Sequence, residues 1–151
     1  MDTTIRPATL RDLPEWIRMR ALLWPECPAE EHLSEARAML DAKDETAFVA
    51  ARDGAGLTGF VEVRLRPYAD GCSSSPVGFV EGWYVDIDAR RCGIGAGLVR
   101  AAEAWAVSRG CSEMASDALL ENYLSQAAHG GIGYEEVERV VRYRKALLPD
   151  L

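Results

Sequence analysis

The chain has no long hydrophobic run and no secretory-type start, and each absence excludes a class of protein. None of the apolar stretches among its 151 residues is long enough to cross a bilayer, so the sequence predicts no membrane-spanning helix. The first residues, MDTTIRP, contain neither a basic start nor an apolar core, unlike a secretory signal. We therefore expect a cytoplasmic protein without a membrane partner.

Cysteine and histidine are few and scattered. No C-x-x-C pair occurs, and the two histidines are far apart in the chain: the residues are Cys27, Cys72, Cys92, Cys111, His32 and His129. We expect neither a metal site nor a disulfide framework. Free thiols suit a reducing compartment.

Positive charge is also in short supply. The formal net charge is −7, which argues against general nucleic-acid binding because that needs basic patches. An acidic chain would attract a cationic partner, although the same acidity also serves solubility alone. The length suits a single domain over residues 1–151 with a substantial core.

The most informative stretch runs from Phe79 to Gly97, where a strand-like apolar run leads into a glycine-rich turn and then a helix. Glycine permits a tight turn, and the first amides of a helix have no partners within it. Together with the helix dipole they favour a phosphate. The spacing is G-x-G-x-G without a following G-K-S/T, so a nucleotide P-loop is poorly supported. The other reading is a helix start that needs small residues only for packing.

The remaining pattern alternates strands and helices. The expected strands are Thr4–Arg6, Thr46–Ala51, Leu57–Leu65, the run from Phe79, Cys111–Asp117 and Tyr134–Leu147. Helices are expected from Thr9 to Pro25, from Pro28 past Leu40, from the glycine turn to Gly110, and from Asn122 to about Gly130. The loop from Arg66 to Pro76 is long enough to be functional.

Periodicity also predicts which side chains face inward. Leu33, Ala36 and Leu40 share one helical face. In the strand from Leu57, the apolar residues Val61, Val63 and Leu65 alternate with Glu62 and Arg64.

Two carboxylates fall near the glycine turn. A strand, a helix and a further strand in this order imply a parallel pair, and ligands bind beyond the carboxyl ends of such strands. Glu81 lies on the central strand and Asp117 ends its expected neighbour, so both can border one cleft and accept from an ammonium group. The alternative is that each is a solvated acid at a strand end.

The turn fits the pattern Arg-x-x-Gly-x-Gly/Ala at 90–95, and with the order β-α-α-β-β-β-α-β-α-β it resembles the GNAT superfamily of N-acetyltransferases. The resemblance implies an α/β (α+β) fold, with a mixed central sheet, splayed parallel strands and flanking helices, and acetyl-CoA as cosubstrate. The residues it implies for acetyl-CoA are Trp83, Tyr84, Val85, Arg90, Arg91, Cys92, Gly93, Ile94, Gly95, Ala96 and Asn122.

Further motifs narrow the resemblance. Short stretches at 23–25, 71–77, 79–82, 114–117 and 134–139, spread over nearly the whole chain, are similar to the aminoglycoside 6′-N-acetyltransferases. That family implies acetyl transfer to the 6′-amine of an aminoglycoside, antibiotic resistance and a homodimer. The antibiotic contacts it implies are Trp24, Tyr68, Glu81, Asp117 and Glu138.

We expect direct attack of the amine on the thioester, because no sequence signal pairs a cysteine with an activating base. Asp117 would hold the ammonium and take its proton through water. His129 stands where many members of the family have a tyrosine that protonates the departing thiolate, and a histidine could donate that proton. An amide near Tyr84 or Val85 would polarise the thioester carbonyl.

Two other functions remain open at this point. One is an acetyltransferase for a protein lysine, an N-terminus or a polyamine, which the fold alone does not distinguish from an antibiotic-modifying enzyme. The other is a catalytically silent acyl-CoA sensor or interaction module.

Overall fold

The computed structural model describes residues 3–54 and 56–148, which divide into two compact units. The boundary between the units follows Asp117. The first unit contains the sheet, and the second contains one helix and the C-terminal segment. None of the helices in these residues is both long and apolar enough to cross a bilayer.

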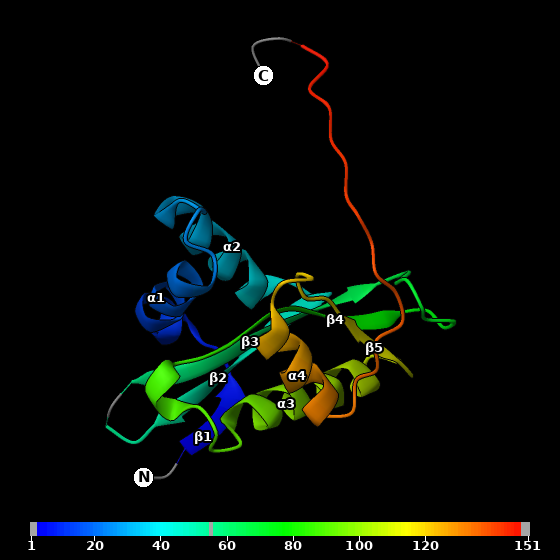
Figure 1. Cartoon of the computed structure of the whole chain (residues 1–151). Coiled ribbons are helices and arrows are strands. Elements are labelled where there is room, and N and C mark those ends of the chain that lie inside the picture. The colour runs from blue at the N-terminus through cyan, green and yellow to red at the C-terminus, as the bar shows by residue number, and fades with distance from the viewer. Residues whose placement is uncertain (1–2, 55, 149–151) are drawn as a thin grey trace. The chain divides into compact units, whose positions relative to one another are not determined.

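The first unit is built on a five-stranded mixed sheet in which the strands follow the order of the chain (Figure 1). The strands are β1 (Thr3–Pro7), β2 (Glu45–Arg52), β3 (Leu57–Arg66), β4 (Val77–Val85) and β5 (Met114–Ser116). Neighbours are antiparallel except β4 and β5, which are parallel. The expected mixed sheet is therefore confirmed, with the parallel pair on either side of the glycine turn in sequence.

Helices cover both faces of this sheet. The helices of the first unit are the short η1 (Leu10–Asp12) and η2 (Ile87–Ala89), and α1 (Leu13–Leu23), α2 (Ala29–Asp41) and α3 (Ile94–Ser108). On one face α1 and α2 bury Trp16 and Met39 against Phe60. On the other face α3 buries Leu98 with Val61. Phe60 and Val61 are consecutive in β3, and successive strand residues point to opposite faces.

The parallel pair separates after three residues. Gly78, Phe79 and Val80 pair with β5, and β4 then continues to Val85 without a β5 partner among the described residues. At the same point β4 contains a bulge, because Glu62 pairs with Gly82 while Val63 pairs with Val80. Glu81 is the additional residue, and a bulge of this kind redirects a side chain.

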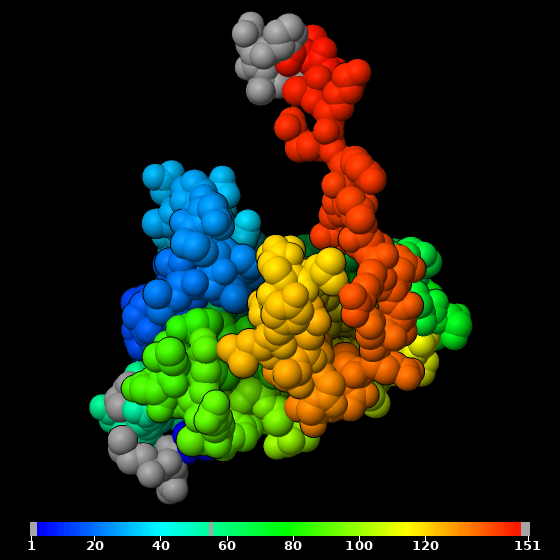
Figure 2. All heavy atoms as spheres, viewed as in Figure 1, coloured from blue at the N-terminus to red at the C-terminus, as the bar shows by residue number. Residues whose placement is uncertain are grey.

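The first correction concerns the expected strand Tyr134–Leu147. Residues 134–146 have no regular secondary structure, and Val137, Val140 and Val141 are exposed. The last described residues, red in Figure 2, form a narrow string of side chains. β-branched and aromatic residues among charges indicate only strand propensity, whereas a strand also needs a neighbouring backbone to pair with. The described residues of the second unit contain no strand.

A second correction concerns two sets of inward-facing residues. In α2 the buried residues are His32, Ala36 and Met39, while Leu33 is exposed. In β3 Glu62 is buried with Val61 and Val63, because helices cover both faces of this strand. Arg20 of α1 is a hydrogen-bond partner of both buried polar residues, His32 and Glu62.

The remaining boundaries differ by a few residues. β5 is shorter than the expected Cys111–Asp117, because Cys111 still donates its amide to the carbonyl of Ala106 and so belongs to the end of α3. In the second unit α4 (Tyr123–Gly131) confirms the helix that was expected from Asn122 to about Gly130.

Candidate functional site

The glycine turn has the backbone that its sequence predicts. Arg91 and Gly93 both have positive φ angles, 66° and 80°, and α3 begins at Ile94. The amide of Gly97 donates to the carbonyl of Gly93 at 3.0 Å, which closes the first helical turn. The amides of Ile94, Gly95 and Ala96 precede that bond and have no earlier helical carbonyl to reach. This end of α3 can therefore hold an anion.

Two hydrogen bonds fasten the turn to the end of β4. Arg90 Nε donates to the carbonyl of Val85 at 2.8 Å, and Trp83 Nε1 donates to the carbonyl of Gly95 at 3.1 Å. The structure thus brings together the predicted groups at 83–85 and 90–96. Cys92 is exposed in the same turn.

The two inner glycines of the turn have different surroundings. A Cβ built on Gly93 meets no atom within 4 Å, whereas one built on Gly95 would lie 3.3 Å from Trp83 Cζ2. A Cβ on Gly97 would lie 2.5 Å from Ile5 Cδ1, so this third glycine serves packing against β1. The open space at Gly93 and the first amides of α3 fit a phosphate group. The end of β4 pairs with β3 but has no β5 partner among the described residues, which fits an extended chain of the same cosubstrate.

The opposite face of the sheet carries Trp24, which follows the last residue of α1. Its ring lies near Phe60, with 6.3 Å between the ring centres. A Cβ built on Gly82 would lie 2.5 Å from Trp24 Cη2, so the indole rests directly on the β4 backbone beside Glu81. Trp24 is half-buried. Its role as an antibiotic contact, which the family resemblance implies, stays a prediction.

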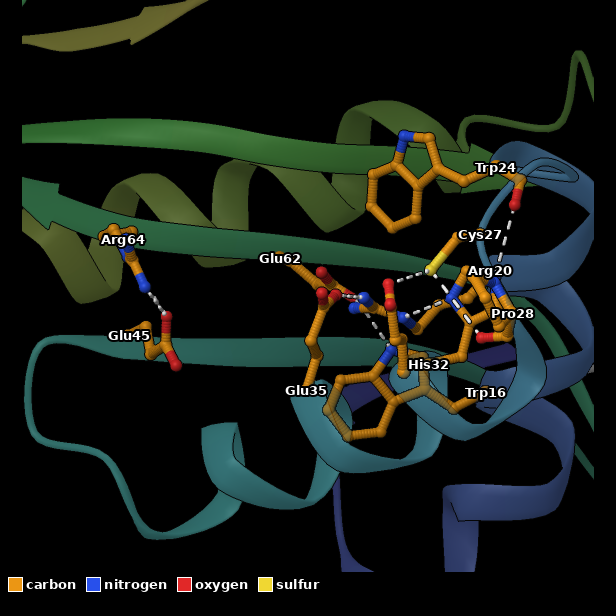
Figure 3. Close-up of polar contacts among 11 residues, drawn as sticks. Trp16, Arg20, Trp24, Cys27, Pro28, His32, Glu35, Glu45, Glu62 and Arg64 are labelled. Atoms are coloured by element: carbon orange, nitrogen blue, oxygen red, sulfur yellow. Dashed lines mark hydrogen bonds and ion pairs between the residues drawn. The ribbon is translucent and has the colours of Figure 1, made fainter. Parts of the chain in front are cut away.

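A cluster of polar side chains, Trp16, Arg20, His32, Glu35 and Glu62, packs against Trp24 (Figure 3). Arg20, four residues earlier in α1, lies 4.9 Å from the centre of the Trp24 ring. Arg20 Nη1 donates to Glu62 Oε2 at 2.5 Å, and Trp16 Nε1 donates to the same oxygen at 2.9 Å. Arg20 also forms an ion pair with Glu35.

His32 completes this cluster. Its Nδ1 accepts from Arg20 Nε at 3.3 Å, so its Nε2 carries the proton and donates to the carbonyl of Trp24 at 3.2 Å. The imidazole also stacks on the Trp24 ring, with the planes 20° apart. Sequence reasoning missed this cluster, and the available signals were a lone Glu62 in an apolar strand and the spacing of Arg20 and Trp24.

Glu62 is the most buried carboxylate of this cluster. Burial raises the pKa of its carboxyl above the ordinary value, and the Arg20 charge with the Trp16 hydrogen bond opposes that rise. All three nitrogens of the Arg20 guanidinium donate within the cluster, to His32, Glu62 and Glu35. We therefore assign the cluster to positioning rather than to proton transfer.

Glu81 has a partner that the sequence did not reveal. Arg66, the last residue of β3, donates from Nε to Glu81 Oε2 at 2.9 Å and from Nη2 to Oε1 at 2.8 Å. The Arg66 guanidinium lies 3.6 Å from the centre of the Phe79 ring. The predicted anchor for a substrate amine is thus already paired with a cation.

The long loop after β3 carries Tyr68, which is exposed and donates from its hydroxyl to Asp70 Oδ1 at 2.5 Å. Glu113, just before β5, fixes the other end of the loop. Its Oε1 accepts from the amides of Ser73 and Ser74 at 2.9 and 2.8 Å. The Ser74 hydroxyl and these amides lower the pKa of the Glu113 carboxyl.

Asp117 directly follows Ser116, whose partner on β4 is Val80. Glu81 directly follows Val80 in the chain. The two carboxylates therefore come at the same level of neighbouring parallel strands, where these strands part. The predicted shared edge is consistent with this register.

The second unit holds the other predicted residues. Asn122 Oδ1 accepts from the amide of Ser125 at 3.0 Å and caps α4. His129 donates from Nδ1 to the carbonyl of Ser125 at 2.7 Å, and its ring meets Tyr134 edge-on at 6.0 Å. Glu138 is exposed in the C-terminal segment. The cofactor or substrate roles of these three residues stay predictions.

Comparison with known proteins gives consistent matches. The family model described as the acetyltransferase (GNAT) family matches residues 16–134. An aminoglycoside N(6′)-acetyltransferase type 1 from Klebsiella aerogenes is 45% identical over 95% of this chain and 96% of its own length. A protein of the same name from Stenotrophomonas maltophilia is 44% identical over 97% of this chain and 95% of its own length.

Solved structures agree with these sequence matches. AAC(6′)-Iy in complex with the bisubstrate analogue CoA-S-monomethyl-acetylneamine has a TM-score of 0.92 and 39% identity, covering 97% of this chain and 99% of that one. AAC(6′)-Ih from Acinetobacter baumannii, an aminoglycoside 6′-N-acetyltransferase, has a TM-score of 0.90 and 37% identity, covering 97% and 99%.

Proposed function

The chain belongs to the acetyltransferase (GNAT) family, and from this membership we propose that it is an aminoglycoside 6′-N-acetyltransferase that confers antibiotic resistance. One structural observation carries the transferase assignment: the glycine turn is hydrogen-bonded to Trp83 and Val85, in the part of β4 that continues beyond its pairing with β5. The names of relatives that match nearly the whole chain support the antibiotic as substrate.

Acetyl-CoA is the cosubstrate, and it supplies the acetyl group as a thioester when bound. The pyrophosphate would lie on the amides from Arg91 to Ala96, at the positive end of the α3 dipole. The pantetheine arm would run beside Trp83, Tyr84 and Val85 as an added strand. An amide near Tyr84 or Val85 would polarise the thioester carbonyl that the amine attacks. Asn122 is a further residue that we propose for cofactor binding, as the family resemblance implies.

The antibiotic site would use the face of the sheet that carries Trp24. An aminoglycoside is a polycation with many hydroxyls, so its site needs carboxylates as acceptors. Asp117 would hold the reacting ammonium and take its proton through water, which makes one group serve binding and base catalysis. Glu81, Tyr68 and Glu138 would be further substrate contacts.

Attack by the amine would be direct. Burial raises the pKa of the Cys72 and Cys111 thiols, and burial followed by the Glu31 carboxylate raises that of Cys27. Nucleophilic cysteines need the opposite shift. His129, whose Nδ1 donates to the carbonyl of Ser125, would protonate the departing thiolate.

The wider setting of the protein is also proposed here. We propose that residues 1–151 act as a single domain, that the protein works as a homodimer in the cytoplasm, and that it binds neither a metal nor nucleic acid. The net charge of −7 supports the last point.

A substrate panel tests the function. Release of free thiol from acetyl-CoA should occur with aminoglycosides that have a 6′-amine and should be lost with analogues that have a 6′-hydroxyl. Lysine peptides and polyamines serve as competing acceptors. Faster turnover with either of these would favour the alternative acetyltransferase, and binding of acetyl-CoA without turnover on any acceptor would identify a sensor.

A further inference from the structure

The pair formed by Arg66 and Glu81 bears on which chemical group the substrate site accepts. Both Arg66 bonds are short and parallel, at 2.9 and 2.8 Å, and each goes to a different oxygen of Glu81. The Arg66 and Glu81 side chains are 39% and 29% exposed, so a ligand can reach this pair. Two-bond arginine–carboxylate pairs are geometrically specific as well as stronger than single bonds.

Arg66 is held in this place by more than Glu81. Its guanidinium lies 3.6 Å from the centre of the Phe79 ring, two residues before Glu81 on β4. Stacking and charge pairing together fix the planar group. The bulge at Glu81 turns the carboxylate toward it, because Glu81 is the residue that has no partner of its own in the β3–β4 register.

A carboxylate has about four lone-pair positions, of which Arg66 occupies two. The others can still accept a hydrogen bond from a substrate hydroxyl. An ammonium at the same position would meet a pair whose charges largely cancel, so it would gain much less than it would beside a lone carboxylate.

We propose that Arg66 is a specificity-determining residue of the substrate site, because it makes Glu81 an acceptor for a substrate hydroxyl rather than an anchor for a second ammonium. This inference rests on the proposed aminoglycoside acetyltransferase function and deepens it. It replaces the ammonium contact that the sequence predicts for Glu81 by a contact with a substrate hydroxyl.

The experiment measures kcat/KM for two aminoglycosides that differ by a hydroxyl or an amine on the ring bearing the 6′-amine, such as kanamycin A and kanamycin B. The ratio of the amine-bearing to the hydroxyl-bearing substrate is the quantity of interest, since it cancels general effects on activity. Arg66→Met should raise this ratio on the order of tenfold at low ionic strength, and added salt should reduce the rise. Arg66→Lys keeps the charge and should change the ratio less.

Arg64→Met is the matched control. Arg64 lies two residues earlier on the same strand and pairs with Glu45 at 2.8 Å (Figure 3). Its replacement therefore deletes the same charge but leaves the hydrogen bonds between Arg66 and Glu81 in place. Arg66→Gln provides a second variant if Arg66→Met is poorly folded by circular dichroism. An unchanged ratio in the folded Arg66 variants, or an equal rise in Arg64→Met, would overturn the assignment. Failure of the parent protein to acetylate either antibiotic would instead refute the proposed function, and the inference would fall with it.

Discussion

The Arg20 guanidinium and the Glu62 carboxylate form an ion pair between α1 and β3, with only 2% and 4% of their side chains exposed. Trp16 donates to the same carboxylate oxygen, and His32 accepts from the same guanidinium. A buried pair of this kind is costly to break, because the remaining charge then has no solvent to replace its partner. Trp24 lies directly against this cluster, so the packing of the first unit and the shape of the proposed antibiotic site depend on the same contacts.

Replacing the buried carboxylate tests this dependence. Glu62→Gln should lower the free energy of unfolding by about 3 kcal/mol, because it leaves the Arg20 charge with only the half-exposed Glu35 as an ionic partner. Glu45→Gln is the control, since it breaks a more exposed pair with Arg64 and should cost less than about 1 kcal/mol. Denaturant unfolding of both variants gives the comparison, and equal losses would contradict the special weight of Glu62.

A methyl group placed under Trp24 should change substrate binding. In Gly82→Ala the new Cβ would lie 2.5 Å from Trp24 Cη2, so the indole must move away from β4. We expect KM for the aminoglycoside to rise on the order of tenfold. The affinity for acetyl-CoA should stay close to that of the parent. Steady-state kinetics and a separate cofactor titration check both statements, and an unchanged KM would remove Trp24 from the substrate site.

The glycines of the turn should separate cofactor binding from packing. Gly95→Glu brings bulk and negative charge to the proposed phosphate site, so acetyl-CoA affinity should fall by tenfold or more, on the order of a lost charge-assisted contact. Gly97→Ala instead presses on Ile5 and should lower stability while leaving affinity nearly intact. Calorimetric titration of acetyl-CoA and thermal unfolding distinguish the two effects. Normal affinity in Gly95→Glu would mean that the phosphate site lies elsewhere.

The proposed substrate carboxylates should matter to turnover and not to the cofactor. Asp117→Asn should lower kcat/KM for aminoglycosides by tenfold or more, because the reacting ammonium loses its counter-charge and its proton acceptor. Glu81→Gln should have a smaller effect, since Arg66 already satisfies much of that carboxylate. Acetyl-CoA affinity, measured separately, should hardly change. Full activity in both variants would favour the protein-acetyltransferase alternative.

Acid stability should depend on Asp12 at the start of α1. Arg6 Nη1 and Nη2 donate to it at 2.7 and 2.9 Å, and the Thr9 amide donates at 2.7 Å. The Arg6 hydrogen bonds, followed by those of Thr9, lower the pKa of the Asp12 carboxyl in the folded protein. The folded pKa is below the unfolded one, so this stabilisation is present at neutral pH and is lost as the pH falls through the folded pKa.

Asp12→Asn should therefore lower stability at neutral pH by about 1 kcal/mol and make the acid limb of the stability curve flatter. Asp53→Asn in the exposed β2–β3 turn is the control. Melting temperatures recorded from neutral to acid pH measure both curves. Parallel curves for the parent and Asp12→Asn would show that Asp12 does not contribute in this way.

Local patterns predicted most of the elements. The helices and the first five strands follow from apolar periodicity and from glycine and proline positions, and the helix expected from Thr9 does begin there, with Thr9 as the N-cap of η1. The segment from Tyr134 was wrong as a strand, because its valines and tyrosine indicate strand propensity but not the neighbouring backbone that a strand requires. Leu33 was wrong as a buried residue for a related reason: the rotation of α2 is set by His32, whose partners belong to α1.

The sequence by itself determined the glycine turn before α3, since glycine spacing, a preceding strand and a following helix are all local features. Tertiary structure alone decided which charged side chains form ion pairs around the proposed site. Arg66 and Glu81 are 15 residues apart, and Arg20 and Glu62 are 42 apart. Each pair meets only through the strand register, the bulge at Glu81 and the packing of α1 on β3. A carboxylate in a sequence carries its charge visibly, but the cation that neutralises it is chosen by the fold.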